Sequence, residues 1–103
     1  LLFERFLENY PDSPLSASII IARGNAFEGL GEIKKAARAY LNSFSLYEDS
    51  PVAPEALTLL GNALVSLGQT DAGCQTLAQV LMRFPGSDFS LEAEKMMSEL
   101  QCP

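Results

Sequence analysis

A sequence pattern that recurs at a fixed interval of 37 residues constrains this chain more than any other feature. Residues 10–14 (YPDSP) return as residues 47–51 (YEDSP), residues 24–26 (GNA) as 61–63, and residues 30–31 (LG) as 67–68. A third, shorter copy begins at Phe84. A repeat of this length is typical of stacked helical units, in which each unit packs mainly on its neighbours.

Apolar residues recur every three or four positions within each copy, which predicts amphipathic helices. Gly31 and Gly68 follow the first helix of each pair and can supply the left-handed residue that ends it. Gly24, Gly61 and Gly73 fall inside helices, where glycine costs about 1 kcal/mol relative to alanine, so we expect close helix contacts there. The apolar stripe of the second helix comprises Ile33, Ala36, Ala37, Tyr40, Leu41, Phe44 and Tyr47.

These patterns predict an all-α, tetratricopeptide-repeat-like fold, a right-handed stack of antiparallel helix pairs with five helices and no strand. We expect one domain over residues 1–103, divided into the second helix of a truncated repeat (1–10), two repeats (13–47 and 50–84) and a C-terminal capping helix (87–101). The repeat is 37 residues long, against about 34 for a standard tetratricopeptide repeat. The additional residues fall in the Asp-Ser-Pro connector.

Composition excludes several classes of function. The net charge of −6 opposes binding to nucleic acid, and no apolar run reaches the ~18 residues of a membrane span, so no membrane insertion is expected. With no His and only two Cys, neither a metal site nor a cofactor is expected. Serine, threonine and acidic residues fall on caps and solvent faces, without the convergent groups that catalysis needs, so we expect a binding protein and no enzyme.

The connectors resemble those of one family in particular. The segments 10–14 (YPDSP), 50–57 (SPVAPEAL), 74–77 (CQTL) and 84–87 (FPGS), together with Gly61, are similar to the C-terminal domain of the Tol–Pal-associated YbgF/CpoB family, over nearly the whole chain. The chain departs from that family at residues 22–25 (ARGN), where an aromatic-Leu-Gly-Glu run is usual. The resemblance implies a periplasmic, non-enzymatic adaptor that contacts Tol-system or other envelope proteins and coordinates outer-membrane constriction with peptidoglycan synthesis during division.

Two alternatives to that function stay open. Outer-membrane assembly lipoproteins share similar connectors, so the chain could be a scaffold of that kind. It could also be a structural or oligomerising repeat module. Leu2, Phe3 and Phe6 cannot all be covered by the single helix that follows, and an exposed apolar patch usually marks a contact. We expect residues 1–10 to pack either on another molecule, which would be self-association, or on a segment upstream of them.

The resemblance to tetratricopeptide stacks also implies a concave groove lined by the first helix of each pair. Asn25 and Asn62 occupy the same position in the two copies, and an asparagine can both donate to and accept from the backbone of a bound peptide. Alternatively, both could bond to neighbouring turns. The remaining predicted groove residues are Ser18, Ile21, Glu28, Glu55, Thr58 and Val65. Ile21 and Thr58 stand where carboxylate-binding relatives carry lysine, which disfavours recognition of an acidic C-terminus.

The basic residues Lys34, Lys35 and Arg38 form a cluster that we expect on the solvated outer face of its helix. The two cysteines leave two alternatives. Antiparallel helices would bring Cys102 to within ~7 Å of Cys74 along the helix axis, and an oxidising periplasm favours a disulfide. Alternatively, Cys74 packs as a small free thiol in its apolar stripe.

Overall fold

The structure is a computed structural model that describes residues 15–103. Five α-helices follow one another along these residues: α2 (Ser16–Gly29), α3 (Ile33–Leu46), α4 (Ala53–Ser66), α5 (Thr70–Arg83) and α6 (Asp88–Glu99). No strand occurs within residues 15–103, so the predicted all-α architecture is confirmed. The predicted helix over residues 1–10, with the exposed patch expected on it, lies outside the described residues.

The first helix of each pair ends at a left-handed glycine. Gly31 has a φ of +79° after α2, and Gly68 has a φ of +84° after α4. Each turn is closed by a backbone hydrogen bond of 2.9 Å, from Glu32 N to Phe27 O and from Gln69 N to Leu64 O. Because L-residues rarely adopt a positive φ, glycine is the residue that best suits these two turns, and the prediction made for them is confirmed.

The helices that follow the connectors begin at residues suited to a helix N-terminus. Pro54 is the second residue of α4, where a missing backbone N–H leaves no helical hydrogen bond unmade. Ser87 caps α6, and its side-chain oxygen accepts a hydrogen bond of 3.0 Å from the backbone N–H of Ser90. These starts set the direction in which each helix leaves its connector.

Within each pair, a large side chain of the second helix rests on a glycine of the first. A Cβ atom at Gly24 would lie 2.5 Å from Tyr40 Cε1, and one at Gly61 would lie 2.8 Å from Leu77 Cδ2. Tyr40 and Leu77 are fully buried. Gly73 brings two backbones together, since a Cβ atom there would lie 2.9 Å from the carbonyl oxygen of Gly61. The close contacts predicted at these glycines are confirmed.

One residue of the predicted apolar stripe on α3 differs from expectation. Leu41 is 47% exposed, although Tyr40 and Phe44 on the same helix are buried. Leu41 lies about 100° around the helix axis from Tyr40, at the edge of the stripe, where the neighbouring helices cover it only in part.

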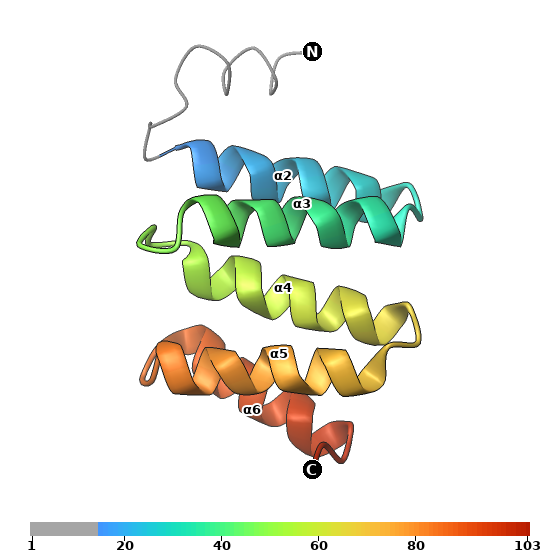
Figure 1. Ribbon diagram of the computed structural model, residues 1–103, viewed down its shortest axis with the longest axis vertical. Coiled ribbons are helices and arrows are strands. Elements are labelled where there is room, and N and C mark those ends of the chain that lie inside the picture. The colour runs from blue at the N-terminus through green and yellow to red at the C-terminus, as the bar shows by residue number, and fades with distance from the viewer. Residues whose placement is uncertain (1–14) are drawn as a thin grey trace.

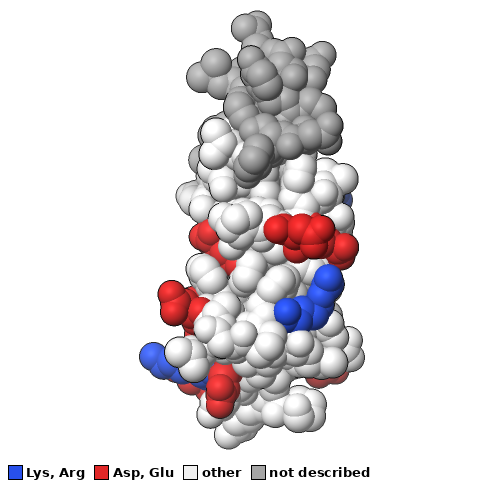
Figure 2. Space-filling view, turned by 90° about the vertical axis from the view of Figure 1, so that its left-hand side faces the viewer, with Lys and Arg blue, Asp and Glu red and all other residues white. Residues whose placement is uncertain are grey.

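The pairs pack on each other in sequence, and the helices lie one above another as a stack (Figure 1). At the C-terminal ends of α3 and α5, the rings of Phe44 and Phe84 meet edge to face at 6.3 Å between centroids. The Arg83 guanidinium lies 4.9 Å from the Phe44 ring centroid and 3.6 Å from a carboxylate oxygen of Glu48. Figure 2 shows this end, where basic atoms lie close to acidic ones and most of the surface is uncharged.

Helix α6 covers the last pair and contacts both α5 and α4 (Figure 1). Ala93 is fully buried, while Glu92, Glu94 and Glu99 face solvent. The helix ends at Glu99, and Gln101 then turns the chain with a φ of +56°. By the 37-residue offset, Gln101 corresponds to Leu64, which is still helical in α4. Helix α6 is therefore shorter than the helices it repeats.

Candidate binding surface

Tyr40 stands at the centre of the residues that the sequence places in a binding groove. Its ring crosses α2 over Gly24, and its hydroxyl donates a hydrogen bond of 2.7 Å to Asn25 Oδ1. The absence of a side chain at Gly24 lets the phenol reach the residue that follows it. The sequence places Tyr40 in the core, and its burial confirms this prediction. No pattern in the sequence indicates that its hydroxyl reaches Asn25.

Two carboxylates from different helices share this environment. Burial raises the pKa of the Tyr40 phenol above its usual value, and the negative charges of Glu28 on α2 and Glu55 on α4 raise that pKa further. A tyrosine is protonated at neutral pH in any case, and the raised pKa extends the range in which the phenol donates to Asn25 further into alkaline pH. Of the predicted groove residues, Asn25 accepts a hydrogen bond from the Tyr40 hydroxyl, and the charges of Glu28 and Glu55 act on the same group.

The side chains of Asn25, Glu28 and Glu55 offer more hydrogen-bond acceptors than donors. Because Asn25 Oδ1 already accepts from Tyr40, its amide nitrogen remains as a donor, with the amide orientation assigned from that bond. Asn25 is exposed, and Glu28 and Glu55 are half-buried. The surface can therefore meet a ligand with one amide donor and two carboxylates, an arrangement that favours backbone N–H groups or cationic side chains.

Asn62 has a different environment from its counterpart. Leu77 takes the place of Tyr40 in the second pair and has no polar atom to offer. Asn62 is exposed, and no residue among 15–103 makes a side-chain hydrogen bond with it. It follows Glu55 by seven residues on α4, so the two lie on the same face of that helix.

Two of the residues predicted to line the groove are buried in the structure. Ile21 is 4% exposed and Thr58 is 3% exposed, so neither lines an accessible groove. Each precedes a packing glycine by three residues, Gly24 and Gly61 respectively, and so lies on the buried face of its helix. The Thr58 hydroxyl donates instead to the carbonyl oxygen of Pro54 at 2.8 Å.

The other two predicted residues stay at or near the surface. Ser18 is exposed on α2, whereas Val65 is half-buried and lies against Gly73. The structure has hollows of about 420 Å³ and about 350 Å³, and none of the eight predicted groove residues lines either of them. Neither of these two hollows is therefore part of the predicted groove.

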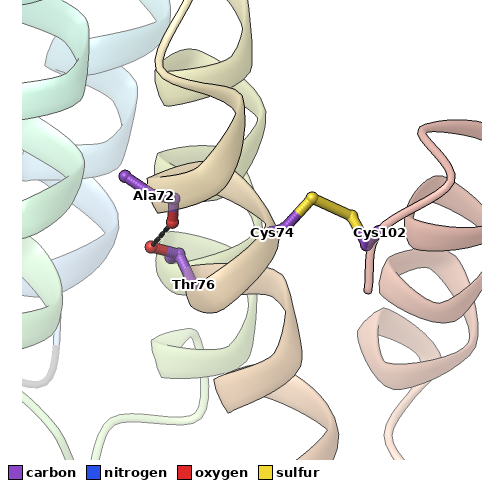
Figure 3. The surroundings of a disulfide bond; sticks show 4 residues. All are labelled: Ala72, Cys74, Thr76 and Cys102. Atoms are coloured by element: carbon purple, nitrogen blue, oxygen red, sulfur yellow. Dashed lines mark hydrogen bonds between the residues drawn. A yellow bond between two sulfur atoms is a disulfide. The ribbon is translucent and has the colours of Figure 1, made fainter.

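The two cysteines form a disulfide with an S–S distance of 2.08 Å and a Cα–Cα distance of 5.7 Å (Figure 3). Of the two alternatives that the sequence leaves open, the structure contains the bond. It joins the first half of α5 to the segment that follows α6, which the early end of α6 allows to turn back (Figure 3). On the other side of α5, the Thr76 hydroxyl donates to the Ala72 carbonyl oxygen at 2.8 Å.

Comparison with known families agrees with the arrangement of the helices in antiparallel pairs. Residues 55–87 match a tetratricopeptide repeat model, which spans most of α4, all of α5 and the connector to α6. The chain has no significant match among curated proteins. The fold is thus an all-α stack of the tetratricopeptide type, a class of modules that bind other proteins and are typically not enzymes.

The described helices add two observations on membranes and metals. None of those between residues 15 and 103 is long and apolar enough to cross a membrane. Over the same residues, no group of three or more acidic or cysteine side chains could hold a metal ion.

Proposed function

We propose that this chain is a non-enzymatic adaptor that binds a segment of a partner protein on the surface around Tyr40. This surface, called the Tyr40 face below, comprises Asn25, Glu28, Tyr40, Glu55 and Asn62. The observation that carries the proposal is the hydrogen bond from the Tyr40 hydroxyl to the exposed Asn25, on a phenol that also feels the charges of Glu28 and Glu55 from two successive repeats. A partner that contacts both repeats would meet groups from α2 and α4 together.

The chemistry of the Tyr40 face favours an extended segment with unpaired backbone N–H groups or basic side chains. Asn25 and Asn62 can bond to a peptide backbone whatever its side chains, which would give affinity without strict sequence preference. Glu28 and Glu55 would add attraction for Lys or Arg. The same carboxylates would repel an acidic C-terminus.

The cell envelope is the proposed setting. The connectors resemble those of the YbgF/CpoB family, and the Cys74–Cys102 disulfide suits an oxidising compartment such as the periplasm. On that basis, the partners would be Tol-system or other envelope proteins, and the adaptor would coordinate outer-membrane constriction with peptidoglycan synthesis during division.

A structural or oligomerising module is the second candidate function, whether alone or as a scaffold similar to outer-membrane assembly lipoproteins. The observation that favours it is the exposure of large apolar side chains, since Leu30 is 74%, Leu46 68% and Met82 72% exposed. Such residues could contact a second copy of the chain.

A pulldown from envelope extract separates the two candidates. The intact protein would be compared with an Asn25→Ala/Asn62→Ala double variant, and with Gln79→Ala as a control at an exposed site on α5. We expect the double variant to lose the captured partner and the control to keep it. Equal capture by all three proteins, or capture of nothing except the chain itself, would contradict binding at the Tyr40 face.

A further inference from the structure

Helix α6 ends in the same kind of turn as α2 and α4, but without their glycine. The backbone N–H of Cys102 donates to the Met97 carbonyl oxygen at 2.9 Å, as Glu32 and Gln69 do in the two earlier turns. The left-handed residue is Gln101, with a φ of +56°, and in the part of the chain that the structure describes no other residue except glycine has a positive φ. Because a side chain disfavours this conformation, the turn has little preference of its own to form.

The second half of α6 packs less closely than the first. Of the residues of this helix, all of which the structure describes, Ser90 and Ala93 are buried, and both lie in its first half. Met96 and Met97 in the second half, and Leu100 just after it, are only half-buried. Helix α4, by contrast, has buried residues in both of its halves. The apolar contacts that hold α6 on the stack are therefore strongest in its first half.

The position seven residues before each turn residue explains this difference. There, α2 and α4 have Gly24 and Gly61, on which the second helix of each pair rests. Helix α6 has Glu94 at that position, and Glu94 is exposed. Within residues 15–103, no following helix covers this face of α6.

Towards α5, the second half of α6 borders the hollow of about 350 Å³. Its lining consists of Asp71, Cys74, Gln75, Ala78, Met97 and Pro103. Side chains therefore do not fill the space between the two helices at this point. The disulfide lies beside this hollow and joins α5 to the segment that follows α6 (Figure 3).

We propose that the Cys74–Cys102 bond is a redox-controlled latch that holds the second half of α6 on α5. When the bond is reduced, residues 96–103 leave α5, while Ala93 keeps the first half of α6 in place. Cys74, which is 6% exposed in the bonded state, then becomes accessible. The rest of the stack stays folded, because each unit of a repeat protein contacts mainly its neighbours.

The reductant is a dithiol. One of its thiolates attacks the sulfur of Cys102, because Cys102 is half-buried whereas Cys74 is buried. Cys74 leaves as a thiolate and takes up a proton. The second thiol of the reductant, as its thiolate, attacks the mixed disulfide and releases Cys102 in the same way. Two electrons thus pass to the cysteine pair, the reductant becomes a disulfide, and an oxidant of the disulfide class reverses both steps.

Alkylation of the thiols in the folded protein tests the latch. The full chain is reduced with dithiothreitol, separated from it without oxygen and treated with iodoacetamide, and mass spectrometry measures the rate at each cysteine. We expect Cys74 to react within about tenfold of the rate at Cys102, which allows an opening free energy of about 1.4 kcal/mol. Greater protection of Cys74 would overturn the proposal, because the segment would then stay on α5 without the bond.

A matched control separates local release from unfolding of the whole stack. Ala37 corresponds to Cys74 by the 37-residue offset and is similarly buried, at 8% exposed, on α3. In the reduced Ala37→Cys variant, the introduced thiol should react at least about tenfold more slowly than Cys74. Ala39→Cys, at a 6% exposed position, takes its place if circular dichroism shows that Ala37→Cys does not fold. Equal rates at Cys74 and at the introduced thiol would overturn a local latch.

Discussion

The Tyr40 hydroxyl donates a 2.7 Å hydrogen bond to Asn25 Oδ1, while the ring of the same residue covers Gly24. The side chain that closes the first helix pair therefore also orients an exposed residue of the proposed binding surface. The second helix pair has the same packing contact, because Leu77 covers Gly61. It lacks the hydrogen bond, since within the described residues the Asn62 side chain has no hydrogen-bond partner.

Removing the Tyr40 hydroxyl should cost stability without disturbing the packing. In Tyr40→Phe the ring still covers Gly24, so we expect the free energy of unfolding to fall by about 1 kcal/mol, the usual net value of one hydrogen bond. Urea unfolding of Tyr40→Phe, Asn25→Ala and the double variant gives the coupling between the two residues. Strictly additive losses would show that the bond contributes nothing to stability.

The same phenol should make stability sensitive to alkaline pH. Burial, with Glu28 and Glu55 nearby, raises the pKa of Tyr40 in the folded state, so the folded chain keeps a proton that the unfolded chain releases. The resulting stability is present in full below the unfolded pKa of about 10 and is lost as pH rises towards the folded value.

We therefore expect the free energy of unfolding to fall above about pH 10, by up to about 1.4 kcal/mol per pH unit from this group. Urea titrations of the unchanged protein and of Tyr40→Phe across this range provide the measurement. Tyr40→Phe should lose stability less steeply, and parallel curves would contradict the raised pKa.

The contact between Gly61 and Gly73 should tolerate no added methyl group. A Cβ atom at position 73 would lie 2.5 Å from Val65 Cγ2 and 2.9 Å from the Gly61 carbonyl oxygen, so backbone must move. We expect Gly73→Ala to lower the free energy of unfolding by about 1–3 kcal/mol, as overpacking does. Gly29→Ala is the matched control, because nothing lies within 4 Å of its Cβ position. Equal effects at the two sites would contradict the close approach.

The sequence predicts the stack well because the 37-residue offset repeats the signals that begin and end each helix. Gly31 and Gly68 are visible as turn residues, and Gly24, Gly61 and Gly73 are visible as contacts because glycine is unfavourable inside a helix. These signals are local, so they can be read without knowing which helices are neighbours.

The burial of the predicted groove residues could be predicted only in part. Asn25, Glu28 and Glu55 have accessible side chains and stay predictions as binding residues, whereas Ile21 and Thr58, predicted for the same groove, are buried. Their spacing of three residues from Gly24 and Gly61 contains the missing information, since a packing glycine marks the face turned towards the partner helix. The bond from Tyr40 to Asn25 depends on how α3 is placed along α2, which no single segment encodes.

The disulfide should stabilise the C-terminal end of the stack. Cys74 and Cys102 are 28 residues apart, and a cross-link closing a loop of this size contributes about 3.6 kcal/mol in the chain-entropy estimate. We expect Cys102→Ser to lower the melting temperature by about 10 °C or more for a chain of this length. Reductant should lower the melting temperature of the unchanged protein to a similar extent and should not affect Cys102→Ser. Insensitivity of both proteins to reductant would contradict a stabilising bond.

Site-specific photo-cross-linking tests the Tyr40 face most directly. A photoreactive amino acid would replace Asn62, which is exposed on α4, and in a second protein would replace Gln79, which is exposed on α5. Gln79 lies about 200° around α5 from Leu77, the counterpart of Tyr40, so it points away from this face. After irradiation in envelope extract, we expect a distinct adduct with another protein at position 62 and none at position 79. The same adduct at both positions, or an adduct at position 62 with nothing except a second copy of the chain, would contradict partner binding at the Tyr40 face.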